Sequence, residues 1–216
     1  MFFMSSTLEI PIYEQTLRGP LDHALREASM HFEEKSAVHQ TLRKIVRRLD
    51  QLGISYAIAG AMAMFQHGYR RFTEDVNLLV TADGLAEIHR QLEGAGYLPP
   101  FTGSKQLRDT ETGVRVEFRV AGQFPGDGKP KPVAFPDPAV AHVEFDGIWF
   151  LPLKDLVQLK LASGMTNPGR LKDLADVQEM IRLLNLPVDF AEQLDPSVRQ
   201  EFQRLWNAVQ NNPSTE

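Results

Sequence analysis

The chain has 216 residues, enough for one sizeable domain with a helical appendage, and its 43% hydrophobic and 24% charged residues are typical of a globular protein. A net charge of −5 argues against non-specific coating of nucleic acid, and the lack of cysteine excludes disulfides and thiolate metal sites. The chain shows neither a signal-peptide pattern nor an apolar run long enough to span a membrane, so we expect a soluble cytoplasmic protein without membrane contact.

The first part of the chain predicts an arm and then an amphipathic helix. Residues 1–35 carry mixed signals, and we expect a loosely packed arm with one short helix around 21–28. Ser36 suits the N-cap of a helix over 37–52, and Gly53 suits its end. Apolar residues recur at helical spacing along this helix, and we expect its charged opposite face to be solvated.

The middle of the chain predicts short strands that alternate with helices. Residues 54–60 and 74–80 are expected to be buried strands, separated by a short alanine-rich helix over 61–68. A further helix is expected over 83–93.

Residues 114–120 alternate strictly between apolar and charged side chains, which predicts a strand with one polar face. Arg115, Glu117 and Arg119 share that face. The two arginines either neutralise Glu117 in a ladder of ion pairs or contact phosphate groups, and the sequence leaves both interpretations open.

The last part of the chain predicts an irregular loop, a hairpin and three helices. Residues 122–138 hold five prolines and three glycines in 17 positions, which excludes regular structure, and the loop lysines Lys129 and Lys131 are expected to be solvated rather than phosphate-bound. A hairpin is expected to turn at Asp146-Gly147. The expected helices cover 153–163, 170–184 and 197–209.

Polar residues with oxygen atoms lie where such a fold would bring them together. Gly60 ends the first strand and opens the short helix, whose free N–H groups are suited to an anion. Asp75 and Asn77 are two residues apart on a strand and therefore point to the same face, and Glu117 lies on the polar face of a later strand. Oxygen ligands beside a glycine turn are what a magnesium-bound nucleoside triphosphate (NTP) requires, so we expect Mg²⁺ or Mn²⁺ with an NTP substrate.

Gly60-Ala61, followed after 13 residues by Asp75-Val76-Asn77, resembles the signature of the polymerase-β-like nucleotidyltransferase superfamily. Within it, the chain is similar to the AbiEii-type, toxin-related group. The supporting segments are residues 71–75 (Arg-Phe-Thr-Glu-Asp), Lys160 on a predicted helix, and residues 170–176 (Arg-Leu-Lys-Asp-Leu-Ala-Asp).

The resemblance implies an α/β (α+β) fold, with a small mixed sheet flanked by helices over 36–151, the arm over 1–35, and a C-terminal helical region over 152–216 that closes one side of a cleft. It also implies Mg²⁺-dependent transfer of a nucleotide from an NTP to an RNA, protein or small-molecule acceptor, in a toxin-related setting with an antitoxin-like partner. The implied catalytic residues and metal ligands are Asp75, Asn77 and Glu117, and the implied nucleotide-binding residues are Gly60, Ala61, Arg71, Lys160 and Arg170.

Other polar residues have simpler interpretations. His67, at the end of an apolar helix, is expected to be a packed histidine rather than a base. Lys160 either snorkels past the core or points into the cleft. Asp173 and Asp176 are expected to hold Lys160 or Arg170 in place rather than to bind metal, although Asp176 can also pair with the lysine one turn before it at position 172.

Two departures from the family signature bear on activity. The turn is Gly-Ala, without a hydroxyl for a phosphate, and Asn77 replaces the second carboxylate, so that an oxygen ligand remains but a charge is lost. The alternative function is therefore a catalytically impaired protein of this fold that binds nucleotide or a partner as a regulatory module.

Overall fold

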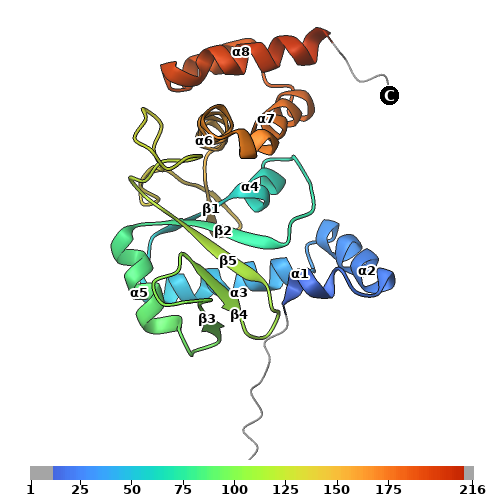
Figure 1. The fold of residues 1–216 in the computed structure, drawn as a ribbon, viewed down its shortest axis with the longest axis vertical. Helices are drawn as coiled ribbons and strands as arrows, with labels where there is room; N and C mark the ends of the chain where they lie inside the picture. The colour runs from blue at the N-terminus through green and yellow to red at the C-terminus, as the bar shows by residue number, and fades with distance from the viewer. Residues whose placement is uncertain (1–11, 212–216) are drawn as a thin grey trace, which may run out of the picture.

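The computed structural model describes residues 12–211, which form a seven-stranded mixed sheet with helices on both faces (Figure 1). The strands are β1 (Tyr56–Ala59), β2 (Asp75–Val80), β3 (Tyr97–Leu98), β4 (Gln106–Asp109), β5 (Arg115–Val120), β6 (Val143–Phe145) and β7 (Ile148–Phe150). Their order is β3-β4-β5-β2-β1-β7-β6. β2 is parallel to β5 and antiparallel to β1, and β1 is parallel to β7. The expected small mixed sheet flanked by helices is confirmed.

The helices are α1 (Tyr13–Thr16), α2 (Leu21–Phe32), α3 (Ala37–Leu52), α4 (Gly60–Gln66), α5 (Ala82–Leu92), α6 (Leu153–Thr166), α7 (Leu171–Leu183) and α8 (Pro196–Asn211), with 3₁₀ turns at Pro168–Arg170 and Val188–Gln193. α3 and α5 lie on one side of the sheet, and α6, α7 and α8 lie on the other (Figure 1). No helix within residues 12–211 combines the length and the apolar character needed to cross a membrane.

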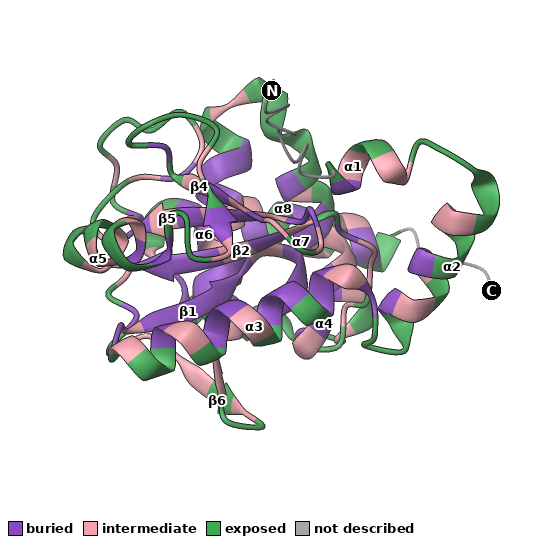
Figure 2. Cartoon of the chain, turned by 90° about the horizontal axis from the view of Figure 1, so that it is seen from below, coloured by how far each residue is buried: buried purple, intermediate pink, exposed green. Residues whose placement is uncertain are grey.

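The central register explains why one side of the sheet is polar. β2 and β5 pair Asp75 with Arg115 and Asn77 with Glu117, so the polar positions of both strands point to the same face. The alternate residues of β2 and β5 point to the opposite face and are buried in the core; they are Val76, Leu78, Val80, Val116, Phe118 and Val120. Figure 2 shows the buried residues of β1 and β2 in purple.

Two features of the fold were not foreseen. β3 and β4 were not predicted, because they are short, lie between glycine-rich turns and depend on pairing across the sheet, β3 with β4 and β4 with β5, rather than on a local pattern. The expected arm lies partly outside the described residues, since residues 1–11 are not described; in its described part, the Tyr13 side chain is 2% exposed and its hydroxyl donates to the buried Glu27 carboxylate at 2.9 Å, a packing contact that the sequence did not predict.

Two buried histidines connect α2 with α3. The Ser36 hydroxyl lies 3.1 Å from Nδ1 of His39 and 3.4 Å from Nδ1 of His31, and Nε2 of His31 lies 3.1 Å from the backbone carbonyl of Arg71. Ser36 is the N-cap residue of α3, as expected, but its side chain is used by the histidines instead of the helix N–H groups. Burial, together with the nearby His31 and Arg43, lowers the pKa of His39 to about 4.

Acid should therefore weaken the fold through His39. The unfolded chain takes up a proton at this residue from pH 6.5 downward, whereas the folded chain does so only near its pKa of about 4. The unfolded state binds more protons in this window, so the free energy of unfolding should fall by about 3 kcal/mol between those pH values. Urea unfolding as a function of pH measures this slope. His39→Gln should flatten it and His23→Gln, on the neighbouring helix α2, should not; equal slopes in all three proteins would contradict the assignment.

Candidate active site

A cleft of about 520 Å³ lies between the polar face of β2 and β5, the helices α6 and α7, and the proline-rich loop 122–138. All eight residues predicted for the site line it: Asp75, Asn77, Glu117, Gly60, Ala61, Arg71, Lys160 and Arg170. α6 and α7, from the expected C-terminal helical region, form one wall of the cleft.

The glycine turn brings the backbone against Asn77. Gly60 has φ +62°, a left-handed conformation that favours glycine, and it follows directly after Ala59, the residue paired with Asn77. A Cβ atom on Gly60 would lie 3.2 Å from both Cβ and Nδ2 of Asn77. Both the backbone conformation and the close approach to Asn77 therefore favour glycine here.

The three predicted metal ligands already have arginine partners. Nη2 of Arg115 lies 3.5 Å from Oδ2 of Asp75, and its Nε lies 3.2 Å from Oε1 of Glu117. Nη2 of Arg119 donates to Oε2 of Glu117 at 2.8 Å and to Oδ1 of Asn77 at 3.3 Å. Of the two interpretations that the sequence left open, the ion-pair ladder is the arrangement present in this structure.

Three further residues complete the surroundings of this ladder, and none was assigned to the site from the sequence. The Thr73 hydroxyl donates to Oδ1 of Asp75 at 2.7 Å, and Nε2 of Gln106 donates to Oε1 of Glu117 at 3.1 Å. Glu14, from α1, lies 3.4 Å from Arg115. A threonine two residues before Asp75 was a usable signal, since both point to one face, but nothing local identifies Gln106 or Glu14.

The oxygen ligands of the cleft suit one divalent cation but not two adjacent cations. Within residues 12–211, no three His, Asp or Glu side chains gather as a metal site built by the protein alone would require. Asp75 and Glu117 supply two carboxylates and Asn77 supplies one neutral oxygen, whereas two adjacent cations need bridging negative charge. A single Mg²⁺ normally keeps water and takes phosphate oxygens from its nucleotide, so two protein carboxylates are enough for it.

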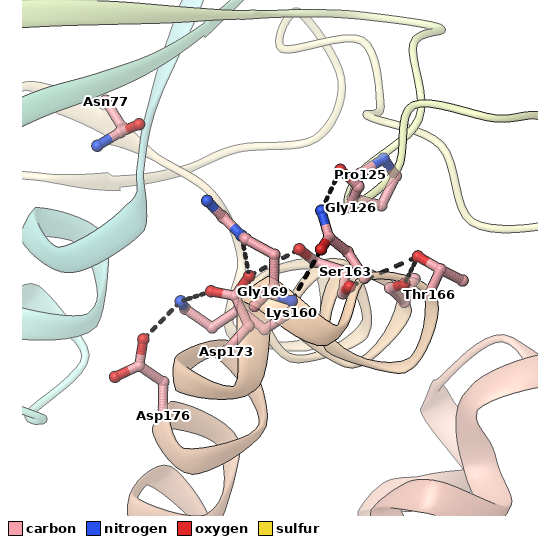
Figure 3. A network of polar contacts seen from close by, with 12 residues as sticks. Asn77, Pro125, Gly126, Lys160, Ser163, Thr166, Gly169, Asp173 and Asp176 are labelled. Atoms are coloured by element: carbon pink, nitrogen blue, oxygen red, sulfur yellow. Dashed lines mark hydrogen bonds and ion pairs between the residues drawn. The ribbon is translucent and has the colours of Figure 1, made fainter.

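The helical wall of the cleft is built around Lys160. Its ammonium group donates to Oδ1 of Asp173 at 2.9 Å and to Oδ2 of Asp176 at 2.7 Å (Figure 3). Burial alone would raise the pKa of Asp173, but the charges of Lys160 and Arg170 and the Ser163 hydroxyl outweigh it, so that pKa lies below its ordinary value. Lys160 therefore points into the cleft, and both aspartates act as its partners, as expected.

Arg71 connects this wall with the strand side, because its guanidinium lies 3.2 Å from the Asp176 carboxylate. Asp176 thus holds two cations that come from opposite sides of the cleft. The suggested pairing of Asp176 with Lys172 is not among the ion pairs formed by the described residues.

The loop 122–138 is attached to the end of α6. Nζ of Lys131 donates to the carbonyl of Pro125 at 2.6 Å and to the Thr166 hydroxyl at 3.1 Å, and Nδ2 of Asn167 donates to the carbonyl of Gly126 at 3.4 Å. Figure 3 shows Pro125, Gly126 and Thr166, which take part in these contacts, beside the Lys160 network. Lys131 was expected to be solvated, but it holds the loop in place. His67 lies outside the cleft lining and contacts the Leu151 carbonyl at 2.8 Å, as a packed histidine does.

No protein-family model matches the chain, and no curated protein matches its sequence. Among solved structures, it is similar to an antigenic nucleotidyltransferase-like protein from Paracoccidioides brasiliensis, with 22% identity, 81% of this chain and 88% of that chain covered, and a TM-score of 0.50. Proposed nucleotidyltransferases from Thermotoga maritima (19% identity, 66% and 91% covered, TM-score 0.42) and H. pylori (16%, 82% and 81%, TM-score 0.44) are more distant in fold. At these identities the likeness concerns the fold alone, which is nucleotidyltransferase-like; the AbiEii-type branch stays a prediction.

The Gly60 turn makes a direct prediction about stability. Gly60→Ala should lower the free energy of unfolding by about 2–4 kcal/mol, because it adds the cost of a left-handed alanine to a close contact with Asn77. Gly94→Ala is the matched control: Gly94 has φ +75°, and its added Cβ would meet nothing within 4 Å. Urea unfolding of both variants separates the cost of the left-handed conformation from the cost of the contact with Asn77. An equal loss of unfolding free energy in the two variants would show that the approach to Asn77 is not tight.

Proposed function

We propose that this protein is a nucleotidyltransferase that uses one Mg²⁺ or Mn²⁺ ion and transfers a nucleotide from an NTP to an acceptor hydroxyl or phosphate. The proposal rests on one observation: Asp75, Asn77 and Glu117 line the same cleft as several cationic side chains, beside the Gly60 turn. Among residues 12–211, the cationic side chains lining the cleft are Arg71, Arg115, Arg119, Lys160, Arg170 and Lys172, against four carboxylates, although the whole chain carries −5. An anionic substrate is therefore favoured here.

In this proposal, each group has a role that its position supports. Asp75 and Glu117 hold the metal ion, which when bound neutralises phosphate charge and orients the reacting phosphate. Asn77 orients the metal or the acceptor through its neutral oxygen. The acceptor oxygen forms a bond to the α-phosphorus, pyrophosphate leaves with the electrons of the broken P–O bond, and the acceptor proton passes to a cleft carboxylate or to water.

The cationic side chains and the turn bind the leaving phosphates. Lys160 and Arg170 line the cleft across from the strands, Arg71 lines it from the segment before β2, and the Gly60-Ala61 backbone lines it at the end of β1. Fixed positive groups aimed at phosphate oxygens stabilise the charge that develops on pyrophosphate. Because Asp173 and Asp176 fix Lys160, this charge is positioned before substrate arrives.

The resemblance to AbiEii-type proteins supports the finer part of the proposal. We infer from it an RNA or protein acceptor, or a small molecule, in a toxin-related setting, with an antitoxin-like partner that controls the activity. The proline-rich loop 122–138 and the helical wall leave the cleft open for such an acceptor, since both line it without filling it.

A second candidate function is a catalytically impaired protein that binds nucleotide, or a protein partner, as a regulatory module. Two observations favour it. Asn77 supplies no charge where the family signature has a carboxylate, and the two remaining carboxylates are ion-paired with Arg115 and Arg119. The two candidates differ in one measurable property, the transfer of label from an NTP.

Label transfer tests the proposed function directly. The protein is incubated with each α-³²P-labelled NTP, Mg²⁺ or Mn²⁺, and total RNA or total protein, and we expect label to appear in one acceptor fraction. Asp75→Asn should reduce the transfer by about a hundredfold or more, because it removes one of two metal-binding charges. Asp22→Asn, at an exposed position on α2, is the control and should keep the activity. If a folded protein transfers no label from any NTP, the enzymatic proposal is wrong; nucleotide binding without transfer would then support the regulatory module.

Asn77→Asp distinguishes an incomplete enzyme from a binding module. The new carboxylate lies within reach of Arg119, which now contacts the Asn77 amide oxygen, and it restores the charge that a metal site lacks. We therefore expect tighter Mn²⁺ binding in the presence of nucleotide and faster label transfer than in the wild type. In a pure binding module, transfer would stay undetectable after this change. Loss of a wild-type activity on substitution would show instead that the amide N–H has a specific role.

A further inference from the structure

Arg115 and Arg119 lie on β5 two residues before and two residues after Glu117, so all three side chains point into the cleft. Both arginine side chains are partly exposed, at 32% and 37%, whereas the Glu117 side chain is only 16% exposed. Each of the two carboxylates, Asp75 and Glu117, is thus paired with a guanidinium group whose side chain is more exposed than the carboxylate's own.

The oxygen atoms that would bind a cation are all engaged. Oδ1 of Asp75 accepts from Thr73, and Oδ2 faces Arg115. Both carboxylate oxygens of Glu117 face an arginine, and Oδ1 of Asn77 accepts from Arg119. A divalent cation that entered without a counter-anion would have to displace these contacts and would lie beside two positive groups, which is electrostatically unfavourable.

A triphosphate offers the two arginines an alternative partner. Guanidinium groups form strong, often bidentate hydrogen bonds with phosphate. These bonds compensate an arginine for the loss of its ion pair with a carboxylate. Arg119 is the freer of the two, because Arg115 also contacts Glu14 on α1. Lys160, by contrast, is held by two buried aspartates, and its side chain is only 12% exposed.

We propose that Arg115 and Arg119 keep divalent cations out of the empty cleft and move onto the phosphates of an incoming nucleoside triphosphate, which frees Asp75 and Glu117 for the metal ion. This inference rests on the proposed function and adds an order of binding to it. The polyphosphate binds without metal, and the cation binds only once the polyphosphate is present.

The experiment uses the full chain and probes that do not depend on the base. Inorganic tripolyphosphate is titrated by calorimetry in EDTA, and Mn²⁺ binding is followed by the electron paramagnetic resonance signal of the free ion, with and without tripolyphosphate. The wild type should bind tripolyphosphate in EDTA and should bind Mn²⁺ at 1 mM only after tripolyphosphate is added. Arg119→Gln should bind Mn²⁺ by itself and should lose about tenfold or more in tripolyphosphate affinity. Arg204→Gln, an exposed arginine on α8 that pairs with Glu201, is the matched control and should behave as the wild type.

Two outcomes would overturn the inference while leaving the proposed function intact. One is Mn²⁺ binding by the wild type without polyphosphate, and the other is unchanged tripolyphosphate affinity in Arg119→Gln; in both, Mg²⁺–NTP binding and label transfer would still be observed. Failure to bind tripolyphosphate or any NTP, with or without metal, in a protein shown to be folded by circular dichroism would overturn both the inference and the proposed function.

Discussion

The register of β2 against β5 is the constraint on which the rest of the structure depends. These strands are parallel and central, and six consecutive residue pairs align them. A slip of β2 by one residue would place Asp75 and Asn77 against the core and would expose residues such as Val76 and Leu78. The same apolar burial that stabilises the sheet therefore fixes the charged residues in the cleft, and no separate interaction is needed to bring them together.

The charges that this register concentrates must be balanced within the protein, because buried unpaired charge is costly. On the strand side, Arg115 and Arg119 balance Asp75 and Glu117. On the helical side, Lys160, together with Arg71 and Arg170, balances two aspartates of α7. The cleft is thus stable without substrate, but for different reasons on its two sides: the helical network is buried and satisfied, whereas the arginines of β5 remain partly exposed and able to change partners.

The sequence predicted most helices, the strands β1, β2 and β5, and the hairpin, because their apolar periodicity and turn residues are local signals. It did not predict β3 and β4, which depend on pairing across the sheet (β3 with β4, and β4 with β5), or the contact between Tyr13 and Glu27 within the arm. The Lys131 side chain illustrates the same limit. Its contacts with Pro125 and Thr166 join segments that no local pattern relates.

By itself, the sequence determined which residues face the cleft. Alternation along β2 and β5 places Asp75, Asn77 and Glu117 on one side of their strands, whatever packs against them. Only the tertiary structure decided what these residues contact. The sequence left open whether Arg115 and Arg119 pair with carboxylates or contact phosphate, and the ladder in the structure is accompanied by contacts from Gln106 and Glu14, which reach the site from other segments. Periodicity fixes the direction of a side chain, whereas its partners are fixed by how distant segments meet, and that meeting is a property of the packed chain.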